Sequence, residues 1–554
     1  MLKSYTYPKF AFRRPPELDG GRIARVPLVV VGAGPVGLAA AIDARLHGLP
    51  VLLLDDDDTV SVGSRGLCYA KRALEILDRL GAGDPVVAKG VNWSVGRTFF
   101  GENEVFRFDL LPESGHKRPG MVNLQQYYLE DYLVRRCEQV GVDLRWRSKV
   151  TAVTPRDEGA TLRVQTPEGD YLLDAAWVIV ADGARSPIRN LLGLDIEGKV
   201  FRDRFLIADV VMKAQFPAER WFWFDPPFHR NQSVLLHREA DDVWRIDFQL
   251  GWDADPEEEK KPEKVIPRIR AMLGDGRDFE LEWVSVYTFQ CRRMSRFNHG
   301  RVLFAGDAAH QVSPFGARGA NSGIQDADNL VWKLALVIQG LAPARLLDTY
   351  SDERVFAADE NIMNSTRSTD FITPKSSVSK TFRKAVLQLA GRHPFARKLV
   401  NSGRLSVPSI YDTSPLNTPD DAEWAGMMGP GAPMDDAPVQ AGGTDGWLLD
   451  RVGNRFRVLM FTQDPSRIDM AALRALSAGP IGVAPLLVTP AGAAAGMAAG
   501  ADTVVDAEGL FARRYDARDG SVWLVRPDQH ICARWRSFDP SRVRAAVARA
   551  TCNA

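Results

Sequence analysis

A glycine pattern near the start of the chain has the spacing of a phosphate-binding turn. Gly32, Gly34 and Gly37 follow an apolar run at 28–31, and an Ala/Leu-rich segment comes next. The first glycine allows a tight turn, the second lets a pyrophosphate approach the backbone, and the third lets the helix pack closely on the strand. A helix starting at Pro35 would offer free N–H groups to the phosphates. The pattern predicts a dinucleotide site.

An acidic residue completes this unit. Asp55 ends the next apolar run, 51–54, and lies where a carboxylate would bind the adenosine ribose hydroxyls. Strand, turn, helix, strand and acid together form one βαβ unit of about 30 residues. Arg65, in a Gly/Ser loop that follows, is a candidate phosphate or ribose contact, and an ordinary exposed loop arginine is the alternative.

Two later strand ends, which we call corners, are also followed directly by a glycine and an aspartate. The run 178–181 leads into Asp182-Gly183, and 302–305 leads into Gly306-Asp307. A glycine-rich stretch and a long helix, expected over about 322–339, come after the second corner. Both corners could bind one extended cofactor molecule together with the glycine turn.

Composition places limits on the protein's class. The chain has 554 residues, so we expect two or three domains. Lys plus Arg equals Asp plus Glu at 70 each, which gives no sign of nucleic-acid binding. The N-terminus lacks a signal peptide's apolar segment, no run approaches the ~18 residues of a membrane span, and a cytoplasmic location is expected. The five cysteines are scattered without a CxxC, which argues against a metal site or dithiol centre.

Changes in pattern along the chain predict its organisation. Residues 200–290 alternate apolar and polar positions, as an antiparallel sheet does, and 402–442 are rich in Pro, Gly, Ser and Asp. The expected parts are an N-terminal arm (1–25), a first nucleotide-binding segment (26–199), an inserted sheet domain that binds substrate (200–284), a second nucleotide-binding segment with helices (285–400), a linker (401–442) and a C-terminal domain (443–554).

The glycine turn and the two corners together resemble one family, the class A FAD-dependent aromatic hydroxylases. The resemblance covers about 26–400 and is most specific around Gly306-Asp307. It is closest to the phenol-type and 3-(3-hydroxyphenyl)propionate-type enzymes. It implies an α/β FAD-binding domain, Rossmann-like and of the glutathione-reductase type, with an inserted antiparallel-sheet substrate domain and a C-terminal thioredoxin-like domain. No cysteine occurs at 461–464, where a dithiol would lie, so packing or homodimer contacts are the expected role of that domain.

The resemblance also assigns cofactor contacts residue by residue. The adenosine half of FAD would be held at its pyrophosphate by Gly32, Gly34, Pro35 and Gly37, and at its ribose by Asp55. Asp307 would bind the ribityl chain, Gln126 would lie near the flavin, and Asp182 would lie at an edge shared with the NAD(P)H groove. The pyrimidine edge of the flavin would accept from backbone N–H groups of Gly319, Ala320 and Asn321. That edge becomes anionic on reduction, and a helix N-terminus suits an anion.

The implied chemistry is oxygen insertion into a small aromatic substrate. NADH or NADPH would reduce FAD, O₂ would add at flavin C4a, and the distal oxygen of the hydroperoxide would attack an activated ring. The cofactor supplies this chemistry and the protein supplies orientation and exclusion of water. Pro314 is expected near the flavin and substrate. Trp221 and Trp223 are candidate substrate-binding residues, with packing of the sheet as the alternative. Candidates to assist phenol deprotonation are Tyr287 and Gln290, followed by His229, His237, Arg292 and His310.

The sequence departs from the family at three places and leaves other functions open. Asp55 replaces the commoner glutamate, Asp56 stands where a basic residue is frequent, and Arg318 stands where glutamine or lysine is common. A halogenase is disfavoured because no WxWxIP-like segment is present. An epoxidase or redox-tailoring oxidase of a polyketide, and a FAD-binding module without turnover, are the remaining alternatives.

Overall fold

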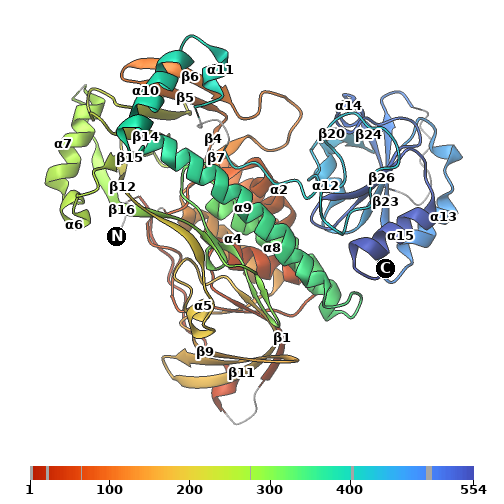
Figure 1. Cartoon of the computed structure of the whole chain (residues 1–554). Helices are drawn as coiled ribbons and strands as arrows, with labels where there is room; N and C mark the ends of the chain where they lie inside the picture. The colour runs from red at the N-terminus through yellow and green to blue at the C-terminus, as the bar shows by residue number, and fades with distance from the viewer. Residues whose placement is uncertain (1–3, 20–23, 64, 275, 401–404, 494–501) are drawn as a thin grey trace.

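A computed structural model describes residues 4–19, 24–63, 65–274, 276–400, 405–493 and 502–554. Parts of the predicted arm and linker, and Ser64 of the Gly/Ser loop, lie outside these ranges. Two sheets and a helical layer form the larger body, and a C-terminal domain lies at one end of it (Figure 1). None of the helices in these ranges is long and apolar enough to cross a membrane.

A parallel sheet forms the centre of the first body. The β-branched run of β1 lies between β2 and β11, with Val30 beside Leu53 on one side and Ile179 on the other. All three side chains are fully buried, as expected for strands covered on both faces. The strand order is β17-β18-β11-β1-β2-β8, with a hairpin attached to β11. The strands are β1 (Ala24–Val31), β2 (Leu52–Leu54), β8 (Asp143–Arg145), β9 (Lys149–Arg156), β10 (Gly159–Thr166), β11 (Gly169–Val180), β17 (Asn298–His299) and β18 (Val302–Phe304).

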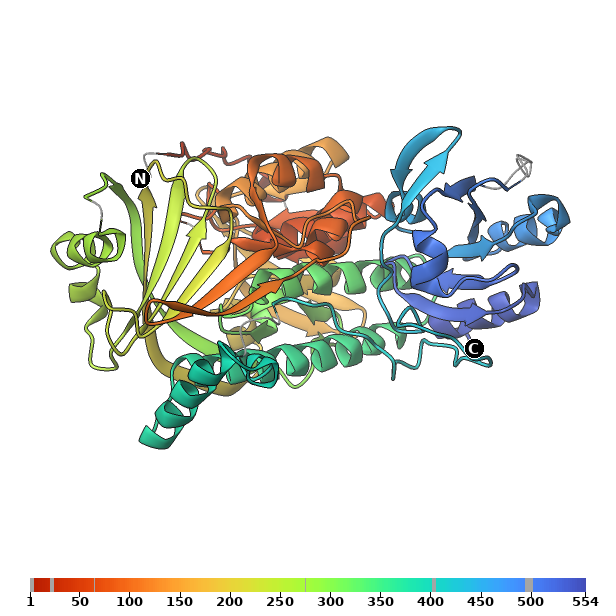
Figure 2. The same ribbon diagram turned by 90° about the horizontal axis from the view of Figure 1, so that it is seen from above.

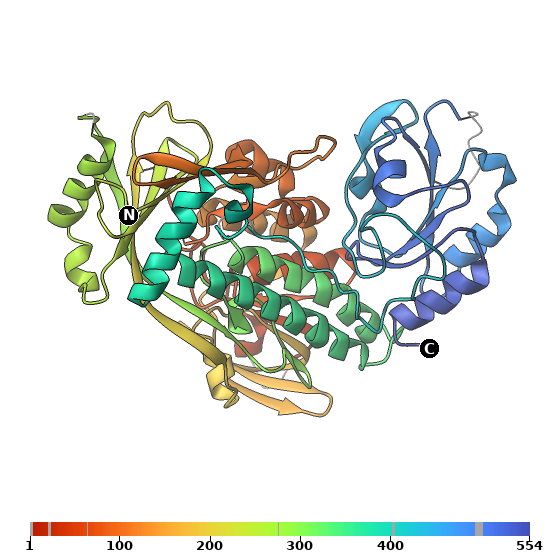
Figure 3. The ribbon, with the colours of Figure 1, turned by 45° about the horizontal axis from the view of Figure 1, so that its top comes forward.

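Helices pack around this sheet. The first, α1, contacts both α4 and α8, and α8 and α9 run side by side toward the C-terminal domain (Figure 3). The amphipathic helix α2 ends at Gly81, which takes the left-handed conformation. The helices are α1 (Pro35–Leu46), α2 (Lys71–Leu80), α3 (Gly83–Lys89), α4 (Gln126–Val140), α5 (Pro187–Leu191), α8 (Gly319–Ile338), α9 (Leu346–Ile372), α10 (Ser377–Ala390) and α11 (Pro394–Arg397), with 3-10 turns at Pro16–Asp19 and Gly306–Ala308.

The second sheet contains the predicted alternating strands and extends beyond their boundaries. Its order is β19-β16-β12-β15-β14-β13-β5-β6. Positions 200 and 284, the expected limits of this domain, fall inside β12 and β16, and β5 and β6 join from the preceding segment. The strands are β5 (Val95–Phe100), β6 (Asn103–Asp109), β12 (Glu197–Val211), β13 (Arg220–Phe224), β14 (Ser233–Arg238), β15 (Val243–Leu250), β16 (Glu280–Arg293) and β19 (His310–Gln311); α6 (Pro256–Glu259) and α7 (Pro262–Leu273) accompany them, and β3 (Cys68–Ala70), β7 (Met121–Asn123) and β4 (Val91–Trp93) form a small third sheet.

The second sheet has two different faces. One face packs Trp244, Ile246 and Phe248 against α7, through Val265 and Ile269. The other face packs Phe205, Phe222 and Phe289 around Phe315, which follows β19 in the chain. We call the latter the Phe315 face. Because strand side chains alternate, each strand contributes every second residue to this face.

The C-terminal domain has its own seven-stranded sheet, seen beside the larger body in Figure 2. The order is β21-β20-β24-β23-β22-β25-β26, and α15 closes the chain after the sheet. The elements are β20 (Pro438–Ala441), β21 (Thr444–Trp447), α12 (Leu448–Val452), β22 (Arg457–Phe461), a 3-10 turn at Pro465–Arg467, α13 (Met470–Ser477), β23 (Ala484–Pro490), β24 (Asp502–Asp506), α14 (Leu510–Tyr515), β25 (Val522–Val525), β26 (Ile531–Trp535) and α15 (Pro540–Ala550).

Buried charges join the two bodies. Arg526, at the end of β25, donates to both carboxylate oxygens of Glu353 on α9, at 2.7 and 3.0 Å, and also pairs with Asp528. Lys333 of α8 donates to the same glutamate at 2.8 Å. The side chains of all four residues are at least 98% buried. The C-terminal domain is therefore held against α8 and α9 by a closed network of ion pairs.

The N-terminal arm packs on the first body. Ser4 donates through both its N–H and its hydroxyl to Glu282 of β16, and the Tyr7 hydroxyl accepts from the N–H of Gly63. Phe10 stacks on Trp146 at a centroid distance of 4.3 Å. The arm thus links the Gly/Ser loop to the second sheet.

Candidate functional site

The glycine turn has the close contacts that its spacing predicts. Gly32 has a φ of 104°, and a Cβ there would lie 2.4 Å from the Ala181 carbonyl oxygen. A Cβ at Gly37 would lie 1.8 Å from the Gly32 carbonyl oxygen. At Gly34, in contrast, a Cβ would meet nothing within 4 Å. Two of the glycines are therefore required by the protein's own packing, and the third faces open space.

The start of α1 carries unused hydrogen-bond donors. Gly34 is the N-cap and Pro35 takes the first helical position, where its missing N–H costs nothing. The N–H groups of Gly34, Val36 and Gly37 find no acceptor in the described ranges. Free amides at the positive end of a helix dipole bind phosphate well. This end of the site fits a pyrophosphate.

Asp55 joins the ends of β1 and β2. Its carboxylate accepts from the N–H groups of Ala33 at 2.5 Å and Asp57 at 2.8 Å. Burial raises the pKa of Asp55 to about 6, against the opposing effect of these hydrogen bonds. The residue lies beside the glycine turn, and its contact with an adenosine ribose stays a prediction.

Gln126 fixes the Gly/Ser loop from the first turn of α4. Its carbonyl oxygen accepts from the Gly66 N–H at 2.8 Å, and its amide donates to Glu130 at 2.7 Å and to Ser61 at 3.2 Å. The amide is thus occupied within the protein, and its influence on a flavin would act through the loop. Arg65 lies exposed in that same loop.

Asp182 has an unsatisfied polar atom beside the glycine turn. One oxygen accepts from the Ile188 N–H at 3.1 Å, and the other is buried with no partner among the described residues. Burial raises the pKa of this carboxyl group. A buried acceptor without a donor is costly unless a ligand supplies one. This orphaned atom fits a site that takes a hydroxyl or amide from a cofactor.

Asp307 lies at the second corner, which packs against α1. Gly306 has a φ of 62°, and a Cβ there would lie 2.9 Å from Val36. The Asp307 side chain is exposed, and its carboxylate contacts no donor in the part of the chain that the structure describes. It is available to accept from ligand hydroxyls, as the ribityl assignment requires.

A buried carboxylate holds this corner in place. Asp326 of α8 accepts from the Gly306 N–H at 2.8 Å, from His310 at 2.6 Å and from Arg354 at 2.6 Å. Burial alone would raise the pKa of Asp326, but His310 and Arg354 together lower it. His310, a sequence candidate for phenol deprotonation, therefore has a structural partner instead.

The start of α8 offers a second set of free donors. The N–H groups of Gly319, Ala320 and Asn321 have no acceptor in the described segments. The Asn321 side chain is used internally: it accepts from the Ala70 N–H and donates to the Cys68 carbonyl oxygen, both at 2.8 Å. The backbone, and not the Asn321 side chain, is what this helix end presents to an anionic ring edge.

Tyr287 and Gln290 point to opposite faces of β16. Their spacing of three residues on one strand separates them. Tyr287 lies beside Phe205 and packs with the cluster around Phe315, and burial raises its pKa. Gln290 lies beside Val200 and has a buried carbonyl oxygen without a partner among described residues. Only Tyr287 joins the Phe315 face, next to the exposed Pro314.

The two predicted substrate tryptophans lie on the other face of the sheet. Trp221 and Trp223 pack with the Trp244 cluster, on the α7 side, and Trp223 stacks on Phe99. Their neighbour Phe222 points to Phe315. Strand alternation is the physical reason, and the placement counts against the tryptophans as pocket residues. Sequence inspection missed Phe222, Phe289 and Phe315, although their alternation with the tryptophans was a signal for them.

The remaining deprotonation candidates have other partners. His229 bonds the Gln249 carbonyl oxygen at 2.7 Å, and Arg292 donates to Gln311 at 3.0 Å. His237 is buried beside Asn123, and burial lowers its pKa well below the usual range. Among described residues, no group of three or more His, Cys, Asp or Glu side chains could hold a metal ion.

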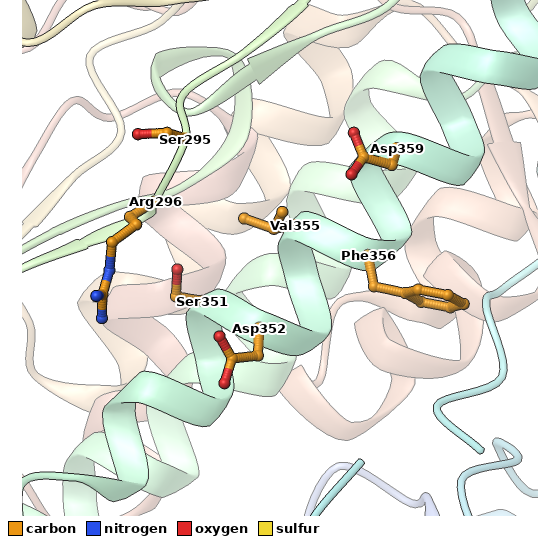
Figure 4. A pocket seen from close by; sticks show the side chains of 7 residues that line it. All are labelled: Ser295, Arg296, Ser351, Asp352, Val355, Phe356 and Asp359. Atoms are coloured by element: carbon orange, nitrogen blue, oxygen red, sulfur yellow. The ribbon is translucent and has the colours of Figure 1, made fainter. Parts of the chain in front are cut away.

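A surface hollow on α9 is separate from these residues. Figure 4 shows its side chains along α9 and the segment before β17. It contains none of the residues predicted to bind cofactor or substrate. Its lining is Ser295, Arg296, Ser351, Asp352, Val355, Phe356 and Asp359.

Comparisons with known proteins agree with this geometry. Residues 25–365 match the family described as FAD binding domain, and 437–550 match the HcaD C-terminal domain. The 6-methylpretetramide 4-monooxygenase of Streptomyces rimosus is 30% identical over 73% of this chain and 72% of its own. The 3-(3-hydroxy-phenyl)propionate/3-hydroxycinnamic acid hydroxylase of Mycolicibacterium smegmatis is 27% identical over 91% of this chain and 90% of its own. The flavin-dependent monooxygenase PieE, solved with FAD and substrate, shares the fold with a TM-score of 0.80, at 24% identity over 96% of this chain and all of that one.

Fold and family together define a flavoprotein with an FAD-binding domain. The chain belongs to the FAD-binding family of the class A aromatic hydroxylases. It is a flavin-dependent monooxygenase that uses FAD with NAD(P)H and O₂.

Substitution of Asp307 tests the flavin end of this site. D307A removes a carboxylate that is exposed and unpaired among described residues, so the melting temperature of the FAD-free protein should stay within about 1 °C. Hydrogen bonds to a charged acceptor contribute roughly 1.5–3 kcal/mol, so FAD should bind about 10- to 100-fold more weakly. Flavin fluorescence titration of the apoprotein measures this, with D56A, on the exposed acidic turn, as a control. Unchanged FAD affinity in D307A would remove Asp307 from the site.

Proposed function

We propose that this monooxygenase hydroxylates a phenolic or related aromatic ring. The observation that carries the proposal is the half-buried Tyr287, which packs with the Phe315 cluster beside the exposed Pro314. The phenylalanines of this cluster are themselves buried, and in the proposal they form the wall behind an aromatic ligand. The relative aligned over nine tenths of both chains is named as a hydroxylase of hydroxyphenylpropionate, which supports the same substrate class.

Within this proposal the protein's residues bind, orient and exclude water. The amides at the starts of α1 and α8 would hold the two ends of FAD, and Asp307 the chain between them. FAD, once reduced by NAD(P)H, supplies the activation of O₂. Tyr287 is the residue we assign to hydrogen bonding with the substrate hydroxyl, because it alone of the two favoured candidates lies on the Phe315 face.

A polyketide is the second candidate substrate. Two relatives at 30% and 32% identity are named as monooxygenases of 6-methylpretetramide and of tetracycline intermediates, which are larger than a simple phenol. An epoxidase or redox-tailoring reaction on such a molecule gives a different product from ring hydroxylation. The two candidates differ in the ligands that stimulate turnover.

We propose a thioredoxin-like fold for the C-terminal domain, with packing as its role. Parallel β22 and β23, joined through α13, and antiparallel β25 and β26 before α15 support the assignment. Cys532 is buried in β26 and Cys552 lies after α15. Neither lies at the end of β22, where a dithiol would act. The buried ion pairs of Arg526 with Glu353 and Asp528 support packing as the role of this domain.

One panel of ligands tests the activity. Phenols, hydroxybenzoates, hydroxyphenylpropionates and a tetracycline-type polyketide would be added to the FAD-loaded enzyme with NADH or NADPH. We expect at least one phenol to stimulate NAD(P)H oxidation about tenfold and to gain one oxygen by mass spectrometry. Stimulation by the polyketide alone would favour the second candidate. No stimulation by any aromatic compound would leave a FAD-binding module without turnover.

A further inference from the structure

Exposed apolar side chains gather on α10, on α11 and just beyond it. Fourteen large apolar side chains of the described residues are exposed, and five of them lie within 378–399. Val378, Phe382 and Leu389 follow one another at intervals of four and seven residues, so they form one stripe along α10. Single exposed apolar residues are normal, whereas a cluster of them marks contact with another molecule. The five are Val378 (76% exposed), Phe382 (57%), Leu389 (40%), Phe395 (61%) and Leu399 (48%).

The charged side chains of this segment are all basic. No aspartate or glutamate occurs between Asp370 and Asp412, although the whole chain carries equal numbers of acidic and basic residues. Five exposed cations lie among the apolar residues, and none of them pairs with a carboxylate of the described residues. We call these cations and the five apolar residues together the α10–α11 surface. The cations are Lys380, Lys384, Arg392, Arg397 and Lys398.

The inner face of α10 fixes this surface in place. Val386 and Leu387 are buried in the cluster around Phe315, and Arg383 donates to the Ile372 carbonyl oxygen at 2.6 Å. Figure 1 and Figure 2 show α10, in teal, at the edge of the larger body. The apolar stripe is thus presented by a helix that is already packed on the protein, and it needs no rearrangement to be exposed.

A second copy of this chain is a poor partner for the α10–α11 surface. In a symmetric dimer the same surface of both copies meets, so the unpaired cations of one copy would face those of the other. Like charges brought together disfavour an interface. The surface instead requires a partner that is anionic and that also accepts apolar side chains. A bilayer with anionic headgroups has both properties, because its phosphates lie directly above its acyl chains.

We propose that the α10–α11 surface docks the protein on an anionic lipid bilayer, with its apolar side chains in the interfacial layer and its cations at the phosphates. Helices with apolar residues along one side and Lys or Arg beside them lie in the plane of such an interface. The long stems of Lys and Arg let the charged groups reach the phosphates while the apolar residues enter the lipid. Docking needs no turnover, so the inference goes beyond the proposed function.

Docking would also bring the proposed substrate site close to the lipid. The helix that would lie on the bilayer packs through its inner face against the Phe315 cluster, which Tyr287 joins. An apolar aromatic compound partitions into a bilayer, so the enzyme would work where such a substrate is concentrated. This consequence for substrate supply rests on the proposed function, whereas the docking itself does not.

Vesicle flotation of the FAD-loaded full chain tests the docking. Vesicles of phosphatidylcholine alone are compared with vesicles of phosphatidylcholine and phosphatidylglycerol, each at low and at high salt. We expect the protein to bind the anionic vesicles at least about tenfold more strongly than the neutral ones, and high salt to remove this preference. The salt comparison uses the unaltered protein, so it does not depend on the folding of any variant.

Two double variants separate the charges from the apolar stripe. K380Q/K384Q removes two cations and should weaken binding to anionic vesicles about tenfold or more. F382S/L389S keeps every cation and should also weaken binding about tenfold, because less apolar area enters the lipid. All four side chains are exposed, so the melting temperature and the flavin spectrum should match those of the wild type.

Matched controls lie outside the surface. K149Q removes an exposed lysine of β9, and M427S removes a methionine that is 71% exposed. Both variants should bind anionic vesicles as the wild type does. A loss of binding in these controls as large as in the double variants would show that the α10–α11 surface has no special role, and would overturn the proposal.

The other results that overturn the proposal are equally distinct. They are no binding to anionic vesicles, or binding that both double variants leave unchanged. Binding of polyglutamate in place of vesicles assigns the surface to an acidic protein. A dimer in sedimentation velocity that F382S/L389S abolishes, without vesicle binding, assigns it to a second copy. None of these results touches the proposed function, which the panel of aromatic ligands tests by itself.

Discussion

G37A should prevent the protein from acquiring FAD because it disrupts the fold of the first βαβ unit. A Cβ at this position would lie 1.8 Å from the Gly32 carbonyl oxygen, which belongs to the backbone and cannot move aside cheaply. Overpacking of a well-packed core costs about 1–3 kcal/mol, and a backbone contact this short is more severe. We expect a lowered melting temperature and purified protein without the yellow colour of bound flavin.

G34A is the matched comparison, since it changes the same motif by the same methyl group. Its Cβ meets no atom within 4 Å, so the FAD-free protein should fold as the wild type does. If the pyrophosphate lies against this backbone, FAD should bind at least about tenfold more weakly, which is about 1.4 kcal/mol. Circular dichroism and flavin titration together give the answer. G34A that binds FAD normally would place the pyrophosphate elsewhere.

R526M should destabilise the protein strongly from a position in the C-terminal domain. Arg526 pairs with Glu353 and Asp528, and the variant would leave Asp528 with the longer contact to His530 and Glu353 with Lys333 as its charge partner. Breaking a buried pair on one side costs about 3–5 kcal/mol. Because Glu353 and Lys333 lie on α9 and α8, we also expect weaker FAD retention. Thermal denaturation followed by both far-UV circular dichroism and flavin fluorescence measures the two effects.

R542M supplies the control within the same domain. Arg542 pairs with Asp421 at the surface, where both side chains are at least 38% exposed, and such pairs contribute about 0–1 kcal/mol. Equal losses in R526M and R542M would mean that the buried network does not stabilise the interface between the two bodies.

The same network gives the stability a defined pH dependence. Burial opposes ionisation of Glu353 and Asp528, but Arg526 outweighs it, and the pKa of each carboxyl group lies well below its ordinary value of about 4. Because the pKa of each carboxyl group is lower in the folded protein than in the unfolded chain, its ionisation stabilises the fold at pH values above the ordinary pKa. This stabilisation is lost as the pH falls through the pKa of the folded protein. The difference in melting temperature between wild type and R526M should therefore narrow below about pH 4.

The sequence predicted elements whose signals are local. The helix at 540–550 begins after Asp539, whose side chain accepts from two N–H groups of the first turn, and Pro540 fits the first position. Gly32 and Gly37 of the glycine turn were predictable because each lies where a Cβ would meet backbone atoms, and the role of Gly34 at a pyrophosphate stays a prediction. The alternation of 244–250 was also predictable, and the structure buries Trp244, Ile246 and Phe248 on one face as expected.

Other features depend on contacts between distant segments. The sequence alone does not tell which side of β13 faces Phe315, so it left pocket lining and sheet packing open for Trp221 and Trp223. The pairing of Arg245 with Asp209 follows from strand order and not from local pattern. Asn321 matched a family motif, yet its side chain bonds Ala70, 251 residues away in the chain.

The strand order of the parallel sheet has a consequence for synthesis of the protein on the ribosome. β1 is complete at Val31, but its neighbour β11 begins only at Gly169, and the last segment predicted to contact flavin ends at Asn321. At translation rates of ~5–20 residues per second, the apolar edge of β1 waits roughly 7–28 s for its partner. The nascent chain thus exposes an unpaired, aggregation-prone strand edge before any cofactor can bind. Chaperone capacity and faster translation should raise the yield of flavin-loaded enzyme more than added riboflavin does.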